Sequence, residues 1–273
     1  MSYWSCKTEG GVVTASYSNP PMNYFCADGA MELGTLIESW QDPAIKAVIL
    51  ASGVAGKFIT HYSVEELLSY AEDREALRKS GTALTAGYHG LLLSLRNLSK
   101  PVIVAMSGDA MGGGFELCLA CDIRIGMRGD FRYGLPEVKL GILPGGSGTQ
   151  RLSRLIGAGR AIDFILRGRI VRPEEALAMG LVHELADDAM AHAVQLAREM
   201  VHLPPLSIAM IKRAVYEGVD TSLADGLDIE SEGFLATMLS DDGVTAMRDY
   251  VAQPLEQRRN WLEKGGTAKY VGH

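Results

Sequence analysis

Three consecutive glycines interrupt an apolar part of the chain and separate a strand-like segment from a helix-like one. In the stretch PVIVAMSGDAMGGGFELCLACDIRI, residues 101–125, the glycines occupy 112–114 and one carboxylate, Glu116, follows them. Glycine is entropically costly in a regular element, and a carboxylate is costly to bury, so a helix that begins with both is unusual. The pattern predicts a buried strand, a turn, and a helix whose first backbone N–H groups face open space.

The same order of elements recurs along the first two hundred residues. Four apolar or β-branched runs are typical of strands, and segments with helical spacing lie between them, including one long charged segment at 63–100. From residue 202 onward the pattern is helical only. Strands that alternate with helices predict an α/β fold with a parallel sheet, here followed by a helical C-terminal piece. The strand-like runs are 11–17, 45–53, 101–108 and 121–127.

Composition limits the classes of protein to which the chain can belong. Its 273 residues suffice for one large domain, or for one domain and a small appendage. A net charge of −7 argues against nucleic-acid binding. The sequence contains no run of 18 apolar residues, so we expect no membrane span. The N-terminus has no signal pattern, and few cysteines in mostly apolar surroundings favour the cytoplasm. Cys118 and Cys121 lack companions for a metal site, so we expect a structural role and no metal.

The glycines and Glu116 admit three interpretations. They could serve tight packing of a strand against a helix, or they could form a phosphate-binding loop. A phosphate loop has Gly-Lys-Ser or Gly-Lys-Thr after its glycines, whereas Phe115 and Glu116 follow here, and a glutamate would repel phosphate. An oxyanion hole for a carbonyl compound, with Glu116 as a proton-transfer group, accounts for both unusual features.

A second carboxylate, Glu137, lies in the glycine-rich stretch YGLPEVKLGILPGGSGTQRL. Taken alone, it is more typical of a solvated loop residue than of a catalyst. Together with Glu116 it would provide two carboxylates that hold and split a water molecule. Such a pair beside a polarised carbonyl predicts acid–base chemistry.

Five segments, in the expected order, resemble the crotonase (enoyl-CoA hydratase/isomerase) superfamily. They are 45–53, 99–125, 133–161, 166–185 and 204–215. The resemblance implies an α/β fold with a crotonase-like ββα spiral core, expected at residues 1–205, and a C-terminal helical trimerisation region, expected at residues 206–273. It also implies an acyl-CoA thioester as the substrate, with no separate cofactor.

Carried over by position, the resemblance assigns roles to three of these residues. Gly113 would donate one backbone N–H to the oxyanion, and Glu116 and Glu137 would be the two carboxylates that hydratases of the family use on water. Isomerases of the family usually keep only one acid, so two acids favour hydration or dehydration. Double-bond isomerisation, thioester hydrolysis, C–C cleavage and non-catalytic acyl-CoA binding stay open as alternatives.

The chain departs from the family pattern in the first oxyanion loop, which usually reads F-x-A-G-x-D-[LI]. Phe58 matches, but Thr60 and His61 replace the alanine and the glycine, and Tyr62 falls on the donor position. Tyr62 can still donate, since every residue except proline has a backbone N–H. Ser63 replaces the aspartate and can begin the next helix through a capping box. His61 removes the conformational freedom of glycine at this point.

The bulky residues of this loop have two interpretations. His61 and Tyr62 either line the acyl pocket, or one of them transfers a proton in a less usual reaction of the family. Tyr24 adds bulk nearby, and Lys57 is placed to meet the CoA phosphates. The predicted substrate-binding residues are Tyr24, Lys57, Phe58, His61 and Gly112.

The C-terminal segment PLEQRRNWL resembles a family segment that reads E-K-R-x-P-x-F, whose lysine can reach the CoA of a neighbouring subunit. Gln257 stands in the place of that lysine. Either Arg258 or Arg259 takes over the contact, or both are solvated helix charges. The resemblance also implies self-association as a homotrimer or a dimer of trimers, and it implies neither a nucleic acid nor a membrane as a partner.

Overall fold

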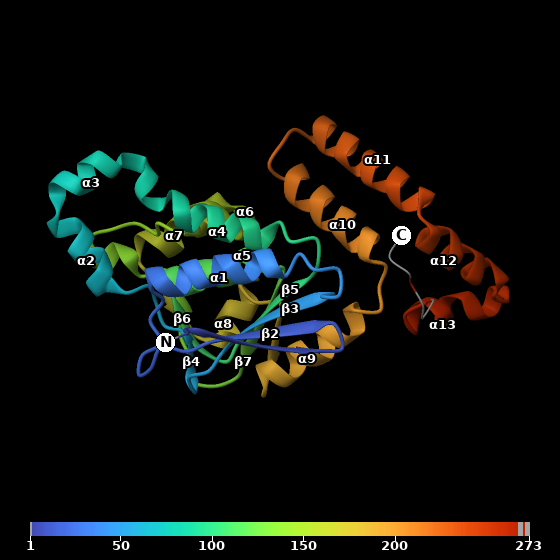
Figure 1. Cartoon of the computed structure of the whole chain (residues 1–273), viewed down its shortest axis with the longest axis horizontal. Helices are drawn as coiled ribbons and strands as arrows, with labels where there is room; N and C mark the ends of the chain where they lie inside the picture. The colour runs from blue at the N-terminus through green and yellow to red at the C-terminus, as the bar shows by residue number, and fades with distance from the viewer. Residues whose placement is uncertain (1, 267–269, 271–273) are drawn as a thin grey trace. The chain divides into compact units, whose positions relative to one another are not determined.

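The computed structural model describes residues 2–266 and residue 270 (Figure 1). The chain forms two compact units: residues 1–96 with 102–197, and residues 97–101 with 198–273. The second unit thus begins inside helix α9 (Ala189–Met200), before the division expected at 205, and it takes in the short segment that precedes strand β5 (Val102–Met106).

A six-stranded sheet, in the order β1-β2-β3-β5-β7-β10, is the larger sheet of the first unit. Only the β1–β2 pair is antiparallel, and every other neighbouring pair is parallel, as the continuous apolar runs predict. The register sets Val48 opposite Val102 and Ile103 opposite Ile123. The strands are β1 (Trp4–Glu9), β2 (Val12–Tyr17), β3 (Ala47–Ser52), β5 (Val102–Met106), β7 (Ile123–Met127) and β10 (Glu184–Ala186).

A second sheet of four short strands, in the order β4-β6-β8-β9, supports the candidate site. Gly108 of β6 lies so close to β4 that a Cβ on it would be 2.1 Å from the carbonyl carbon of Gly56. Beyond the paired strands, the N–H of Met111 donates to the carbonyl of Thr60 at 2.9 Å, which draws the glycine-rich turn to the loop after β4. The strands are β4 (Gly56–Ile59), β6 (Gly108–Met111), β8 (Tyr133–Gly134) and β9 (Ile170–Val171).

The long helix expected over 63–100 is interrupted. The side chain of Asp73 accepts the N–H of Ala76 and starts a new helix, and Gly81 ends that helix with a φ of 53°. Figure 1 shows α2 and α3 extending away from the sheets, and neither helix has a buried residue. The segment therefore divides into α2 (Val64–Glu72), α3 (Arg74–Ser80), the 3₁₀ helix η1 (Gly81–Thr85) and α4 (Ala86–Arg96).

An aromatic cluster beneath helix α1 fixes the loop that precedes it. The ring of Tyr17 lies 5.1 Å from that of Trp4 and 5.2 Å from that of Phe25, at tilted or edge-on angles. The Tyr17 hydroxyl donates to the carbonyl of Tyr24 at 2.8 Å. The core thereby holds Tyr24 and Phe25, which border the candidate site. The remaining helices of this unit are α1 (Ala27–Ser39), α5 (Gly113–Ala120), α6 (Gly148–Ile156), α7 (Ala158–Leu166) and α8 (Pro173–Ala178).

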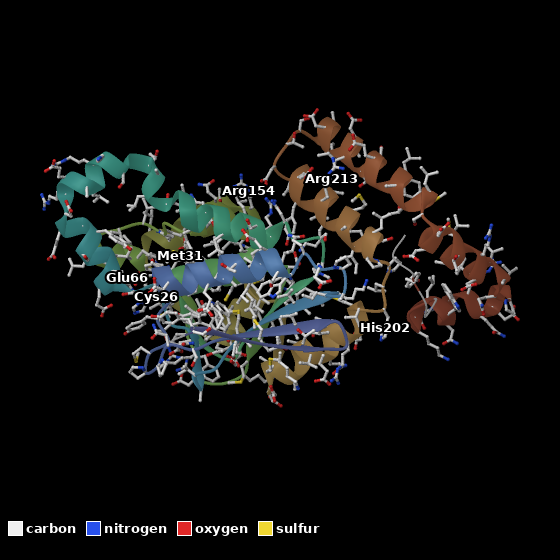
Figure 2. The ribbon with its side chains drawn as sticks, viewed as in Figure 1. Cys26, Met31, Glu66, Arg154, His202 and Arg213 are labelled. Carbon is white, nitrogen blue, oxygen red and sulfur yellow. The ribbon has the colours of Figure 1, made fainter. Side chains whose placement is uncertain are left out.

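The second unit is helical, as the sequence predicts. Arg213, labelled in Figure 2, bonds Glu217 on its own helix and Glu232 on the next, which ties α10 to α11. The helices are α10 (Pro205–Gly218), α11 (Leu223–Leu239), α12 (Asp241–Ala252), the 3₁₀ helix η3 (Leu255–Gln257) and α13 (Arg258–Glu263). No helix in the described part of the chain has both the length and the apolar character needed to cross a bilayer.

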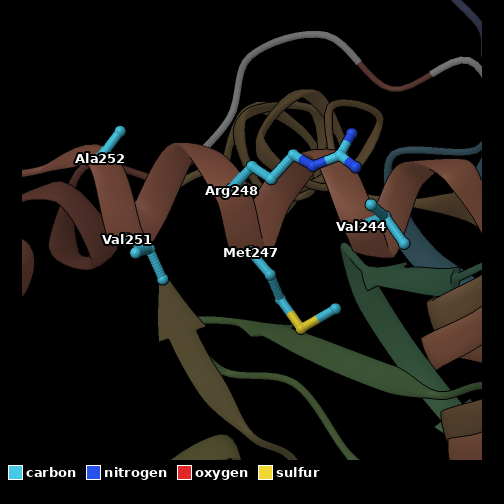
Figure 3. A pocket seen from close by; sticks show the side chains of 5 residues that line it. All are labelled: Val244, Met247, Arg248, Val251 and Ala252. Carbon is cyan, nitrogen blue, oxygen red and sulfur yellow. The ribbon is translucent and has the colours of Figure 1, made fainter.

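Large apolar side chains of this unit stay exposed in the single chain. Phe234, Leu235 and Leu239 of α11 are 66%, 60% and 75% exposed. One side of α12 carries a pocket of about 470 Å³ (Figure 3). The pocket is lined by Val244, Met247, Arg248, Val251 and Ala252.

Candidate active site

Two of the three glycines are required by the backbone where α5 begins. Gly112 has a φ of 50°, a region that favours glycine. A Cβ on Gly114 would lie 2.0 Å from the carbonyl oxygen of Ile59, so only glycine allows α5 to approach β4 this closely. Gly113 is the first helical residue, and the position of its Cβ would be 3.0 Å from the Cβ of Tyr62. The glycines thus bring the start of α5 against the loop that contains Tyr62.

The loop at 61–63 runs parallel to Phe25. The N–H of Phe25 donates to the carbonyl of His61 at 2.8 Å, and the N–H of Ser63 donates to the carbonyl of Phe25 at 2.7 Å. The Tyr62 nitrogen lies 3.6 Å from the Cβ position of Gly113. Neither Tyr62 nor Gly113 donates its backbone N–H to any residue that the structure describes. Two unpaired donors, the two predicted for the oxyanion hole, therefore lie side by side.

Glu116 is buried and held by three hydrogen bonds. Its carboxylate accepts the N–H of Gly146 at 2.8 and 2.9 Å and the N–H of Gly148 at 2.6 Å. A Cβ on Gly146 would lie 2.5 Å from the same carboxylate, so the glycines of the segment 145–148 let the backbone close around it. The prediction of a lone buried carboxylate on a helix is confirmed, and its donors come from the second glycine-rich stretch.

Glu137 is buried as well, so its interpretation as a solvated loop residue is wrong. It begins the 3₁₀ helix η2 (Glu137–Leu140) and is 8% exposed. Its carboxylate receives no hydrogen bond from another residue among 2–266 and 270. Its Oε1 lies 3.3 Å from the position of a Cβ on Gly112, so this unpartnered carboxylate borders the start of α5.

Burial governs the ionisation of both carboxyl groups. Burial, and then the negative charge of Glu137, raises the pKa of Glu116 to about 8, against the N–H groups of Gly148 and Gly146 and the charge of Arg151. Burial raises the pKa of Glu137 to about 7. The two carboxyl groups interact, so they titrate as a coupled pair. The N–H groups of Gly146 and Gly148 donate to the carboxylate of Glu116, whereas no other residue that the structure describes donates to the carboxylate of Glu137.

The bulky loop residues lie at the same place. The rings of Tyr24 and His61 are stacked, with centroids 4.1 Å apart at 23°, and the Cβ of His61 lies 3.7 Å from the Cβ position of Gly112. Burial, and then the Glu66 carboxylate, raises the pKa of Tyr62 well above its ordinary value. His61 does not lie in the left-handed region, so the glycine it replaces is not needed for its φ.

Two predicted substrate-binding residues occupy less exposed positions than expected. Phe58 is fully buried, and its carbonyl accepts from the side chain of Asn23. The Nζ of Lys57 lies 3.9 Å from a carboxylate oxygen of Asp109, so its charge already faces an anion. Gly112, also predicted to bind substrate, is buried and contributes to the site through its backbone conformation.

The capping box is only half formed. The hydroxyl of Ser63 accepts the N–H of Glu66 at 3.2 Å and begins α2, as predicted. The N–H of Ser63 donates to the carbonyl of Phe25 instead of to Glu66, and the carboxylate of Glu66 accepts the N–H of Ala27 at 3.0 Å, at the start of α1. Cys26 and Glu66, labelled in Figure 2, mark these two helix starts.

The sequence did not point to Tyr88 or Asn23. The hydroxyl of Tyr88 donates to the carbonyl of Gly113 at 2.7 Å. Asn23 is fully buried with a φ of 57°, and the N–H of Asn19 donates to its side chain at 2.7 Å. A left-handed asparagine within NPPMN is a turn signal that could have marked this loop. No pattern connects Tyr88 to Gly113, because the contact depends on the packing of α4 against α5.

The C-terminal arginines have partners near at hand. Arg258 donates to the carbonyls of Gln253 and Val251, at 3.2 and 2.9 Å, and Arg259 pairs with Glu263 at 2.8 Å. Arg258 is thus bound to the backbone at the end of α12 and Arg259 is paired within its own helix, and a contact of either arginine with CoA stays a prediction.

Comparison with known proteins identifies the relatives of the chain. A sequence model described as enoyl-CoA hydratase/isomerase matches residues 7–263. The chain belongs to this family. It is 32% identical to a short-chain-enoyl-CoA hydratase of Clostridium acetobutylicum over 89% of this chain and 92% of that protein. It is 34% identical to a mitochondrial methylglutaconyl-CoA hydratase of Mus musculus over 74% of this chain and 64% of that protein.

Solved structures confirm the crotonase fold. A crystal structure of an enoyl-CoA hydratase from Bacillus anthracis superposes with a TM-score of 0.84 at 26% identity, covering 99% of this chain and 100% of that one. The enoyl-CoA hydratase/isomerase family is a family of enzymes, and the resemblance given by the sequence segments is thereby confirmed.

Proposed function

We propose that this enzyme catalyses the reversible addition of water to the double bond of an α,β-unsaturated acyl-CoA thioester. The observation that carries the proposal is a pair of buried carboxyl groups beside two unpaired backbone N–H groups. The carboxyl groups are those of Glu116 and Glu137, and the N–H groups are those of Tyr62 and Gly113. The names of the relatives, which are hydratases of CoA thioesters, support it.

The two N–H groups would bind the thioester oxygen. As water adds to the β-carbon, negative charge develops on this oxygen and an enolate forms. The N–H groups of Tyr62 and Gly113 would stabilise that charge, and the N-terminus of α5 adds a positive potential. No separate cofactor is needed, because the backbone supplies the electrophilic assistance.

The two glutamates would divide the proton transfers. Glu116, whose carboxylate accepts the N–H groups of Gly146 and Gly148, would take a proton from water as the oxygen attacks the β-carbon. Glu137, whose carboxyl is buried without another donor, would deliver its proton to the α-carbon. Proton exchange with solvent then returns both carboxyl groups to their starting protonation states. Dehydration is the same path reversed.

The substrate contacts follow from the positions of the remaining predicted residues. Tyr24 and His61 would border the acyl group, and Phe58 would act through the loop that it supports. Lys57 would meet the CoA phosphates by exchanging its pairing with Asp109 for a phosphate. A cytoplasmic location stays part of the proposal, and fractionation of cells would test it.

A test of the reaction is to incubate the purified protein with crotonyl-CoA in ¹⁸O-labelled water and to follow the products by mass. We expect a product heavier by one labelled water, and its loss in the Glu116→Gln, Glu137→Gln double variant. Release of free CoA, or a shifted double bond at unchanged mass, would contradict hydration.

We also propose that the exposed apolar side chains of the second unit are covered in a homotrimer or a dimer of trimers. Phe234 and Leu239 are too exposed for a stable surface of a single chain. Light scattering at micromolar concentration should give a trimer or hexamer, and Phe234→Asp should lower the mass. A monomeric parent protein would contradict the proposal.

A further inference from the structure

A histidine and a tyrosine form a stacked pair at the loop that carries the Tyr62 N–H. The rings of Tyr24 and His61 lie nearly parallel, with centroids 4.1 Å apart, and both side chains are half-buried. Two contacts therefore fix the orientation of the His61 ring: one face stacks on Tyr24, and one ring nitrogen bonds to the backbone.

A hydrogen bond of the imidazole forms a ring that includes the peptide bond between His61 and Tyr62. The Nδ1 of His61 lies 2.7 Å from the carbonyl oxygen of Tyr62, and since a carbonyl only accepts, Nδ1 carries the proton. The covalent path between these two atoms passes through the Cα of His61, the 61–62 peptide and the Cα of Tyr62. The Tyr62 N–H belongs to this path, so the peptide cannot rotate without breaking the hydrogen bond.

A second contact fixes the same peptide from its other side. The carbonyl of His61 accepts the N–H of Phe25 at 2.8 Å, and Phe25 is fully buried in the aromatic cluster. In a trans peptide the N–H points opposite to the carbonyl, so this bond directs the Tyr62 N–H away from Phe25. The peptide is thus restrained by a core contact at its carbonyl and by the imidazole on its other flank.

We propose that His61 is a positioning residue: stacked on Tyr24, it holds the Tyr62 N–H in the orientation that binds the thioester oxygen, and it transfers no proton. The inference rests on the proposed function, because that function gives the N–H an oxygen to bind. Its Nδ1–H is committed to the Tyr62 carbonyl, and one face of its ring is covered by Tyr24.

The same residue also borders the acid. The Cβ of His61 and the Oε1 of Glu137 lie 3.7 and 3.3 Å from one point, the Cβ position of Gly112. A loop that shifts at His61 would therefore change the space between the oxyanion donor and the carboxyl of Glu137. This raises the expected cost of losing the imidazole above that of one surface hydrogen bond.

The test compares His61→Ala with His61→Asn, whose side-chain amide can donate to the Tyr62 carbonyl in place of Nδ1. In steady-state hydration of crotonyl-CoA we expect His61→Ala to lower kcat about tenfold with little change in KM, and His61→Asn to recover most of that loss. The pH profile should keep its shape in both variants, because both glutamates remain.

A binding measurement separates this inference from the proposed function. Acetoacetyl-CoA forms an enolate that absorbs in the ultraviolet, and the enolate oxygen reports the oxyanion hole without any hydration. His61→Ala should reduce the bound enolate fraction, His61→Asn should restore it, and thermal stability should change little. A parent that binds the enolate but adds no water would refute the proposed function and leave the positioning role standing.

Tyr24 supplies the control for the stacking contact. Tyr24→Ala removes the aromatic face that stacks on the imidazole and should lower the bound enolate fraction more than Tyr24→Phe, which keeps that face. Enolate binding unchanged in His61→Ala would overturn the proposal. So would a His61→Asn variant as poor as His61→Ala together with the loss of one limb of the pH profile, which would mark a proton-transfer role.

Discussion

The two sides of the candidate oxyanion hole are built differently. On the α5 side, the backbone conformation favours glycine at 112, and the close contact with β4 requires glycine at 114. On the loop side, the backbone at His61 is ordinary, and side chains hold it: the imidazole of His61 and the core beneath Phe25. The α5 side could thus be predicted from the glycines in the sequence, whereas the loop side depends on contacts between residues far apart in the sequence.

The largest effect should come from closing the gap that glycine leaves on the α5 side. Gly114→Ala would place a methyl group 2.0 Å from the Ile59 carbonyl, so we expect a loss of about 3 kcal/mol or more in unfolding free energy and no activity. Denaturant unfolding measures this. Gly159→Ala, at the second residue of α7 and with nothing within 4 Å of the added Cβ, is the control and should be neutral or slightly stabilising.

Removing a single donor from the α5 side should be nearly as harmful to catalysis and far less harmful to the fold. Gly113 is the first residue of α5, a position that tolerates proline, so Gly113→Pro deletes the N–H and leaves the helix possible. We expect kcat to fall about a hundredfold or more. Gly113→Ala adds a carbon but keeps the N–H, and it should lose much less. Equal losses in the two variants would remove this N–H from the oxyanion hole.

The unpartnered carboxyl of Glu137 gives a pH-dependent effect of intermediate size. Its pKa is about 7 in the folded protein, above the ordinary value of 4.5, so the folded state holds the proton more tightly than the unfolded state. Stability should therefore fall as the pH rises from about 4.5 to 7 and level off above that. Glu137→Gln should lack this part of the decline and become more stable than the parent, by the order of 3 kcal/mol, at pH 8. Urea unfolding of the parent and of Glu137→Gln from pH 5 to pH 8 tests this. The same dependence of unfolding free energy on pH in both proteins would contradict it.

The smallest effect belongs to the side chain that accompanies the loop donor. Tyr62→Phe removes the hydroxyl but keeps the N–H and the ring, which packs against Phe25 and Tyr88. The pKa of this hydroxyl is raised, so it is a poor proton donor or acceptor at neutral pH. We expect kcat to stay within about threefold of the parent in steady-state assays. A collapse of kcat would reassign the proton transfer to Tyr62.

Much of the fold could be predicted because its signals are local. The parallel strands follow from continuous apolar runs, and the buried Glu116 follows from its apolar neighbours on a helix. The interruption of the 63–100 helix also had local signals, an aspartate that caps and a glycine with positive φ, which its helical spacing concealed.

The remaining features of the site depend on tertiary contacts. Glu137 looks like a loop residue, and it is buried only because η2 packs beside the start of α5. Tyr88 reaches Gly113 across 25 residues of chain, and the imidazole of His61 acquires its role from Tyr24. Spacing in a sequence carries no information about such pairs.

The division of labour between the two glutamates is the central claim, and hydrogen exchange at the α-carbon tests it most directly. Butyryl-CoA is saturated and cannot be hydrated, so exchange of its α-hydrogen in D₂O needs only the oxyanion hole and the group that serves the α-carbon. We predict that Glu116→Gln loses hydration by about a hundredfold or more yet keeps α-exchange, whereas Glu137→Gln loses both. Exchange that persists in Glu137→Gln and vanishes in Glu116→Gln would contradict the assignment.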